Sequence, residues 1–260
     1  MSDNRRVLLA IDVGNTQTHM GAFDGSELVE HWRFGTDAEA TADELAVRVS
    51  SVLPLRGMGL DSIDGSIVSS VVPPLSPEYE RMARRYLDVR HIGVVPGIKT
   101  GIAIRMDNPR ELGDDRLVNA VAAYDRFGGP CAVVDFGTAV TFDVISRDGE
   151  YVGGVIGPGV RISMDALAER AARLPKVELG EPGPVIGKTT QASMLSGMIY
   201  GFAGAIDAIA RRVMAEMGEE IDFIATGGGA DLIVPYCDTI NEIDDLLTLT
   251  GLRLIWELNE

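Results

Sequence analysis

Residues 10–23 read AIDVGNTQTHMGAF and combine a strand-like pattern with an abrupt polar interruption. The apolar run at 7–12 ends in the carboxylate of Asp12, small and polar residues follow, and residues 18–23 turn apolar again. This alternation predicts two strands, at 7–12 and 18–23, joined by a polar turn. A turn of Gly, Asn and Thr presents backbone N–H groups and hydroxyls to an anion, and a carboxylate at a strand end suits hydrated Mg²⁺.

The same pattern returns at residues 131–145, CAVVDFGTAVTFDVI. A shift of 123 residues, which takes residue 12 to residue 135, aligns Asp12 with Asp135, Gly14 with Gly137 and Thr18 with Thr141. One aspartate at a strand end is often only the start of a β-turn, but two at matched offsets indicate a repeated unit. We therefore expect two similar domains that face one another and hold the phosphates of a nucleotide between them.

Hydrophobic periodicity outside the repeat predicts strands alternating with helices, and hence an α/β fold. The expected further strands are 28–34, which completes an antiparallel meander, 65–72, 91–95 and 221–229; the expected helices are 42–53, 73–87, 114–127, 161–174 and 191–217.

The long helix expected at 191–217 carries two kinds of stripe. Its apolar residues are Met194, Met198, Phe202, Ile206, Ile209 and Val213, and its small residues are Ser193, Gly197, Gly201 and Gly204. Glycine costs about 1 kcal/mol in a helix interior, so its repeated use indicates a close contact with another helix. That contact is either packing within the chain or a homodimer interface.

The composition excludes several classes of partner. The chain has 260 residues, 46% of them hydrophobic, and a formal charge of -16, so nucleic acids and acidic membranes would be repelled. No stretch is expected to cross a bilayer. The two cysteines, Cys131 and Cys237, read as reduced thiols of a cytosolic protein, and the three histidines show no metal-ligand spacing.

Three further motifs bear on chemistry. TGGG at 226–229 follows an apolar strand and permits close approach of a base or phosphate, because it lacks Cβ atoms. GKTT at 187–190 is not a P-loop, since Pro182 occupies the position of the required glycine, but Lys188, Thr189 and Thr190 remain candidate anion contacts at a helix start.

LGDDR at 112–116 places two carboxylates and an arginine at the start of a helix. Asp114 and Asp115 fit ordinary capping and the helix dipole. Arg116 suits either a bidentate contact with a carboxylate substrate or an ion pair with a neighbouring acid.

The chain resembles type III pantothenate kinases, members of the acetate and sugar kinase, heat-shock protein and actin superfamily. The resemblance runs nearly end to end, and it rests most on DVGNT at 12–16 together with DFGTAVTFD at 135–143. The other matching segments are NPRELGDDR at 108–116, GGVIGPG at 153–159, IGKTTQASMLSG at 186–197, TGGGA at 226–230 and LTLTGL at 247–252.

This resemblance implies an actin-like ATPase fold of two ribonuclease H-like domains, at 1–113 and 114–260, with the active site in the cleft between them. It implies ATP-dependent phosphorylation of the 4′-hydroxyl of pantothenate, the first step of coenzyme A biosynthesis, by a cytoplasmic homodimer that binds neither nucleic acid nor membranes. The implied cofactors besides ATP are Mg²⁺ and a monovalent cation, K⁺ or NH₄⁺.

Roles are carried over position by position. Asp115 would be the general base. ATP would be bound by Asp12, Val13, Gly14, Asn15, Thr16, Gln17, Thr18, His19 and Thr138. Mg²⁺ would be held at Asp12 and the monovalent cation at Asp135. Pantothenate would be bound by Met106, Gly113, Asp114, Asp115 and Arg116, with Thr190 contributed by the partner subunit.

Two positions depart from the family's usual pattern. Asp114 stands where the family has a small alanine, and Met106 stands where it has a tyrosine. A second carboxylate would raise the pKa of Asp115 or repel an anionic substrate unless it points to solvent. These departures motivate a non-catalytic, ATP-binding regulatory homologue as the alternative function. A sugar kinase of the same superfamily is a further alternative, although two cysteines cannot form the zinc-binding cluster of that branch.

Overall fold

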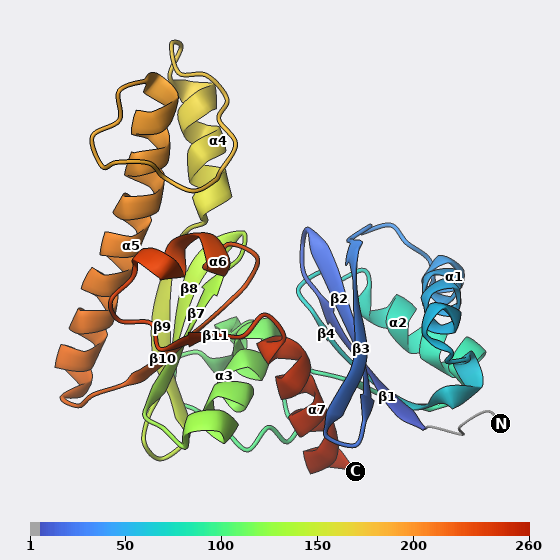
Figure 1. The fold of residues 1–260 in the computed structure, drawn as a ribbon. Helices are drawn as coiled ribbons and strands as arrows, with labels where there is room; N and C mark the ends of the chain where they lie inside the picture. Colours follow the sequence, from blue (N-terminus) through green and yellow to red (C-terminus); the bar gives the residue numbers. More distant parts are fainter. Residues whose placement is uncertain (1–5) are drawn as a thin grey trace. The chain divides into compact units, whose positions relative to one another are not determined.

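The computed structural model describes residues 6–260 and divides into two compact units (Figure 1). The first unit contains the chain up to Ile102 together with Asp107–Ala122 and Leu247–Glu260. The second contains Ala103–Met106 and Ala123–Leu246. Each unit is built around one mixed β-sheet, as the α/β pattern predicts.

The first sheet has the order β3-β2-β1-β4-β5. Its strands are β1 (Val7–Val13), β2 (Gln17–Asp24), β3 (Glu27–Gly35), β4 (Ile63–Ser70) and β5 (Arg90–Gly93). The first three form the expected antiparallel meander, and β4 and β5 run parallel to β1. Because β1 and β4 are parallel neighbours, their carboxyl ends lie at the same edge of the sheet.

The second sheet repeats this arrangement. Its strands are β6 (Ala103–Ile104), β7 (Cys131–Phe136), β8 (Ala139–Ile145), β9 (Glu150–Pro158), β10 (Asp222–Thr226) and β11 (Glu242–Ile243). Their order is β11-β10-β7-β8-β9-β6, so the run β9-β8-β7-β10-β11 has the topology of the first sheet, and β6 extends it. The repeat and the two ribonuclease H-like domains are thus confirmed.

The two hairpins differ by one residue in their turns. Asp12 pairs with His19 in the first hairpin, whereas Asp135 pairs with Thr141 in the second. Thr141 therefore corresponds to His19 in strand position, and the predicted alignment of Thr18 with Thr141 is wrong by one residue. The difference arises because the turn of the second hairpin is one residue shorter than the turn of the first.

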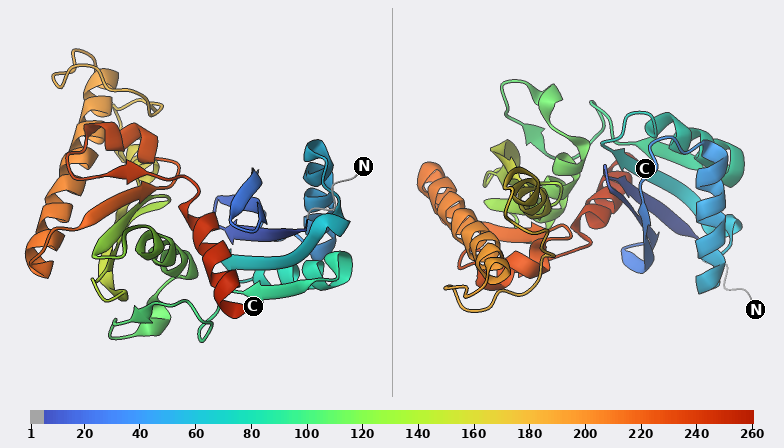
Figure 2. Two further views of the ribbon diagram at one scale, coloured as in Figure 1. Left: turned by 60° about the horizontal axis from the view of Figure 1, so that its bottom comes forward. Right: turned by 90° about the horizontal axis from the view of Figure 1, so that it is seen from above.

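Helices cover both faces of the first sheet. Helices α1 (Ala42–Val52) and α2 (Ser76–Met82) pack on the buried side chains of β1 and β2, such as Ile11 and Met20 (Figures 1 and 2). The expected helix at 73–87 is shorter, because residues 83–87 form a wider π-helical turn. Helix α7 (Leu247–Asn259) packs against β1, β2 and β4, and Gly65 provides the space, since a Cβ there would lie 2.4 Å from the Trp256 ring.

The two compact units do not meet at the expected boundary between residues 113 and 114, because α7 belongs to the first unit. The C-terminal helix and the start of α3 (Asp114–Phe127) belong to the first unit. An added Cβ at Gly251 would lie 2.2 Å from the carbonyl oxygen of Val118, so α7 also packs closely on α3 within this unit. Residues distant in sequence therefore complete the first unit.

The second unit contains α4 (Val160–Arg170), α5 (Thr190–Met217) and α6 (Ala230–Ile233). One side of α5 packs into the core through Ile199, Ala203 and Ile206. Contrary to prediction, α5 is long and apolar enough to span a membrane by length and composition, with a mean hydropathy of 1.3 over its most apolar window. Helices packed on the core of a non-membrane protein can pass the same test, so this is weak evidence for a membrane.

Candidate active site

The turn between β1 and β2 lies at the carboxyl edge of the first sheet. It is closed by a hydrogen bond from the Gly14 N–H to the Gln17 carbonyl oxygen, 3.0 Å long. Asn15, Thr16 and Gln17 are exposed, whereas Thr18 is buried. Gly14 is required by close approach, because a Cβ would lie 2.9 Å from the Gln17 oxygen. The turn therefore offers small, exposed polar groups on a rigid strand end.

Asp12 is the last residue but one of β1, close to this turn, and is partly buried. Its Oδ1 accepts a hydrogen bond of 3.1 Å from the hydroxyl of Ser69, the paired residue on β4. Burial and the nearby charge of Asp115 raise the pKa of Asp12 to about 7, against the lowering effect of Ser69. The charged form of Asp12 is thus costly unless a cation neutralises it.

The predicted general base, Asp115, is the second residue of α3. Asp115 is partly buried, and its Oδ1 accepts a 2.8 Å hydrogen bond from the Arg116 N–H. Burial raises the pKa of Asp115, and Arg116 opposes that rise. Gly113 leaves room for this carboxylate, since a Cβ there would lie 2.6 Å from Oδ1. Burial and the charge of Asp115 raise the pKa of Asp114 to about 6.

His19 lies on the same face of the first sheet as Asp12, with which it pairs, and its ring is partly buried. Burial, with the charges of Arg33 and His31, lowers the pKa of His19 to about 4. The imidazole is therefore neutral at pH 7 and offers one donor and one acceptor rather than a positive charge.

The second unit carries the other predicted phosphate turn. Asp135 nears the end of β7 and is partly buried, while Thr138 is exposed in the β7–β8 turn. Gly227 follows β10 with φ +87°, and a Cβ there would lie 2.3 Å from Oδ1 of Asp135. Gly159 packs on the same turn, since a Cβ added to it would lie 2.3 Å from the Thr138 carbonyl oxygen. Two glycines therefore line the surroundings of Asp135 and Thr138.

The remaining predicted residues also belong to the second unit. Met106 is partly buried next to β6, and Thr190 is exposed as the first residue of α5. The hydroxyl of Thr189 caps this helix by accepting a 3.1 Å hydrogen bond from the Ala192 N–H. The GKTT segment is thus the start of a helix, as expected, and Lys188 is exposed beside it.

Asp12 and Asp135 suit cations whose remaining ligands are phosphate oxygens and water. Among residues 6–260 there is no group of three or more His, Cys, Asp or Glu side chains able to hold a metal. Mg²⁺ needs only one or two protein carboxylates when phosphates and water complete its shell, so Asp12 fits that role. Asp135 is a partly buried carboxylate against which the Gly227 backbone packs closely, and carboxylate and carbonyl oxygens are ligands that hard cations prefer.

Three residues around these turns were not predicted: Ser69 beside Asp12, Thr36 beside Gly14 and Gly159 beside Thr138. Ser69 could have been recognised from the sequence, because the serine pair at 69–70 ends the apolar run of β4 as Asp12 ends the apolar run of β1. Thr36 and Gly159 become neighbours of the turns only through strand pairing and helix packing.

Known proteins match this chain over almost its full length. A family model described as type III pantothenate kinase matches residues 8–212. The chain belongs to the type III pantothenate kinase family. A curated type III pantothenate kinase from Streptomyces avermitilis is 51% identical over 97% of this chain and 98% of its own length. One from Myxococcus xanthus is 48% identical, with coverage of 97% and 99%.

A solved structure of component A of (R)-2-hydroxyglutaryl-CoA dehydratase from Acidaminococcus fermentans has a TM-score of 0.52 and 16% identity, and the match covers 98% of this chain and 100% of that one. At this identity the likeness concerns the fold alone, and it agrees with an actin-like ATPase architecture. Membership of the type III pantothenate kinase family makes the chain an enzyme, an ATP-dependent kinase.

Proposed function

We propose that the chain transfers the γ-phosphoryl group of ATP to the 4′-hydroxyl of pantothenate, the first step of coenzyme A biosynthesis. The observation that carries this proposal is the charge interaction of Asp115 with Asp12 within one unit of a family member: a partly buried carboxylate of raised pKa lies within electrostatic reach of a carboxylate beside a phosphate-type turn.

In the proposed reaction Asp115 is the general base. Its carboxylate takes the proton of the pantothenate 4′-hydroxyl, the hydroxyl oxygen forms a bond to the γ-phosphorus, and the bond from that phosphorus to the β–γ bridging oxygen breaks to release ADP. A base of raised pKa holds the proton more strongly late in transfer. Phosphoryl transfer otherwise asks for in-line positioning and charge neutralisation.

ATP is assigned to the β1–β2 turn, from Asp12 to His19, and to Thr138 of the β7–β8 turn. Asp12 would hold Mg²⁺, and Asp135 would hold K⁺ or NH₄⁺. When bound, these cations would neutralise charge on the phosphates. The support for the two positions is chemical: Asp12 is a carboxylate of raised pKa at the carboxyl end of β1, and Asp135 is a partly buried carboxylate beside the β7–β8 turn.

Pantothenate is assigned to Gly113, Asp114, Asp115 and Arg116 at the start of α3, to Met106, and to Thr190 of the partner subunit. Arg116 would bind the substrate's carboxylate, for which a guanidinium is geometrically suited. Met106 offers an apolar contact in place of a hydroxyl. Neither nucleic acid nor a membrane is part of this proposal, because the net charge of -16 opposes both.

A homodimer through α5 completes the proposal. Gly197, Gly201 and Gly204 are exposed, and a Cβ at each would meet no atom within 4 Å. The neighbouring groove between α5 and strands β8 and β9 has a volume of about 320 Å³, and Met198 and Phe202 are among its apolar lining residues. An open small-residue stripe beside an apolar groove suits a second copy better than packing within the chain. Both cysteines are free, in keeping with the cytoplasm.

A coupled assay that follows ADP release tests the function. The purified protein receives ATP, Mg²⁺ and either pantothenate or a panel of sugars, with and without K⁺. We expect K⁺-dependent turnover with pantothenate alone. Turnover with a sugar instead would identify a sugar kinase, and a folded protein without pantothenate turnover would contradict the proposal.

One observation favours the second candidate, a non-catalytic ATP-binding homologue. Asp114 has a pKa of about 6, so it is charged at pH 7.5 next to the proposed base, where it opposes an anionic substrate. Calorimetry separates this candidate from the first, since it predicts ATP binding without phosphopantothenate formation.

A further inference from the structure

Thr36 contacts the β1–β2 turn at two points, although it follows β3. Its hydroxyl donates to the Gly14 carbonyl oxygen over 2.7 Å. Its backbone N–H donates to the Thr16 carbonyl oxygen over 3.0 Å. A single residue, 22 positions beyond Gly14 in the chain, therefore holds two carbonyl groups of the turn.

These two bonds set the direction of the turn's donors. In a trans peptide unit the C=O and the following N–H point in opposite directions. Because the carbonyls of Gly14 and Thr16 point at Thr36, the N–H groups of Asn15 and Gln17 point away from it. Asn15 and Gln17 are both exposed. Outward backbone N–H groups held in a turn are able to bind an anion.

The Thr36 hydroxyl is itself held by a buried chain of hydroxyls. The Thr18 and Thr36 Oγ1 atoms lie 2.9 Å apart. Since Thr36 gives its only hydroxyl proton to Gly14, Thr18 must donate to Thr36. Tyr79 lines the same cavity as Thr18, and burial raises the pKa of Tyr79 to about 12 although Thr18 and Arg48 act to lower it, so the phenol keeps its proton at physiological pH. The hydroxyls therefore donate in one direction, from Thr18 to Thr36 and from Thr36 to the turn.

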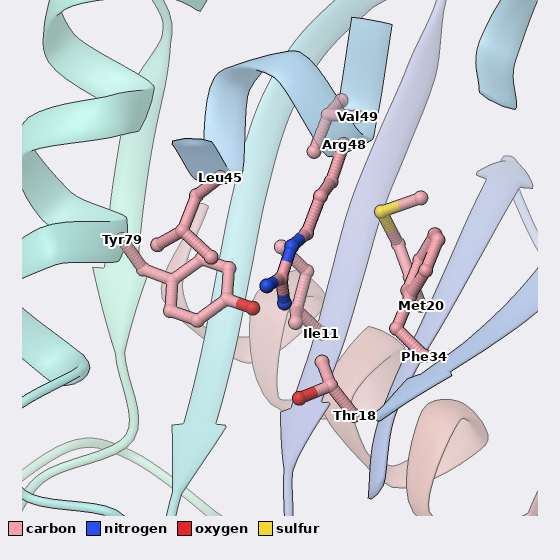
Figure 3. A pocket seen from close by; sticks show the side chains of 8 residues that line it. All are labelled: Ile11, Thr18, Met20, Phe34, Leu45, Arg48, Val49 and Tyr79. Atoms are coloured by element: carbon pink, nitrogen blue, oxygen red, sulfur yellow. The ribbon is translucent and has the colours of Figure 1, made fainter. Parts of the chain in front are cut away.

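The surroundings leave this chain little freedom. Tyr79, Arg48 and Thr18 line one small cavity between α1, α2 and the sheet, as Figure 3 shows. Its volume is about 10 Å³, about the least that holds one water molecule. Arg48 also reaches the residues on either side of Thr36: one guanidinium nitrogen lies 3.4 Å from the Gly35 carbonyl oxygen and another 3.4 Å from Oδ2 of Asp37.

We propose that Thr36 is a positioning residue for ATP, which fixes the β1–β2 turn so that its outward N–H groups meet the phosphates. This inference rests on the proposed assignment of that turn to ATP. Thr36 itself touches no substrate in this account. Its effect should therefore fall on nucleotide affinity and leave the pantothenate site unchanged.

Thr36→Val removes the hydroxyl, keeps the side chain's shape and keeps the backbone bond to Thr16. We expect the KM for ATP and the calorimetric dissociation constant for MgATP to rise about tenfold, the usual effect of one lost hydrogen bond. The KM for pantothenate should stay within about twofold of wild type, and Thr36→Ser should restore ATP affinity to within about threefold.

Thr100→Val is the matched control, because the buried Thr100 hydroxyl closes a turn of the same unit by donating to the Ile102 carbonyl oxygen. It should lower thermal stability to a similar degree and leave ATP affinity unchanged. Equal loss of ATP affinity in Thr36→Val and Thr100→Val would overturn the inference, because general destabilisation would explain both.

Asp12→Asn separates failure of this inference from failure of the proposed site. If Asp12→Asn weakens MgATP binding and Thr36→Val does not, the turn binds ATP and the role of Thr36 is refuted. If neither substitution changes MgATP binding, the assignment of the turn to ATP fails and the inference fails with it.

Discussion

The hydroxyl of Ser69 donates a 3.1 Å hydrogen bond to Oδ1 of Asp12, and the parallel register of β1 and β4 places the two residues side by side. Ser69 is fully buried, so its hydroxyl has little freedom to turn elsewhere. Even with this donor, burial and Asp115 raise the pKa of Asp12 to about 7. In the unliganded protein the ionised form of Asp12 is therefore unfavourable. A bound cation would offset this cost.

Asp12→Asn should therefore stabilise the unliganded protein at high pH while it weakens ATP binding. Unfolded Asp12 loses its proton near pH 4, whereas the folded form keeps it to about pH 7, so the free energy of unfolding falls as pH rises between these values. Asparagine does not titrate. The variant should exceed wild type by about 2 kcal/mol at pH 8 and by little at pH 4, allowing for partial solvent exposure.

Urea denaturation at both pH values, in EDTA and without nucleotide, measures this difference. Asp64→Asn on β4 is the control, since it removes an exposed carboxylate from the same sheet. An equal gain for Asp12→Asn at pH 4 and pH 8 would show that its effect does not come from the titration of Asp12.

Asp114→Asn should shift the pH dependence of the kinase. Asp115 contributes to the raised pKa of Asp114, and a charge interaction acts equally on both partners, so charged Asp114 disfavours ionisation of the base. Removal of that charge should move the acid limb of kcat/KM for pantothenate to lower pH by about half a unit to one unit. Glu111→Gln, an exposed change nearby, should leave the profile in place, and a profile of Asp114→Asn that superimposes on wild type would rule out this coupling.

Gly227→Ala should disrupt the surroundings of Asp135, whereas Gly228→Ala should be tolerated. Gly227 has φ +87°, and its Cβ would lie 2.3 Å from Oδ1 of Asp135 and 2.9 Å from the Phe136 backbone. No atom lies within 4 Å of the corresponding position at Gly228. Thermal unfolding and activation by K⁺ should both suffer in the first variant, with a stability loss of about 2 kcal/mol or more. Equal thermal stability and equal K⁺ activation in the two variants would show that the packing of Gly227 on Asp135 affects neither property.

The polar strand ends were predictable because Asp12 and Asp135 interrupt apolar runs in the same way, and a repeat in sequence implies a repeat in structure. The one-residue difference between the hairpins was not predictable by a fixed shift, because register depends on the length of each turn. Helix α7 was missed because its apolar residues pack on a sheet that begins some 240 residues earlier, which local periodicity does not report.

The supporting residues of the site were hidden for a similar reason. Ser69 lies 57 residues from Asp12 and Thr36 lies 22 residues from Gly14, and only strand pairing brings each to its partner. The acidic start of α3 was visible in GDDR, but the interaction of Asp115 with Asp12 depends on the packing of the first unit. Sequence therefore indicated which residues carry chemistry, and the fold supplied the residues that position them.

We propose Asp115 as the base for phosphoryl transfer to pantothenate, and its replacement tests this role directly. Wild type and Asp115→Asn, both shown to be folded by circular dichroism and to bind MgATP equally, are compared with saturating pantothenate and K⁺ while 4′-phosphopantothenate is quantified by mass spectrometry. We predict that kcat falls about 100-fold or more in Asp115→Asn, the usual contribution of a positioned base. Product formation by Asp115→Asn at a rate within a few-fold of wild type would show that Asp115 is not the base.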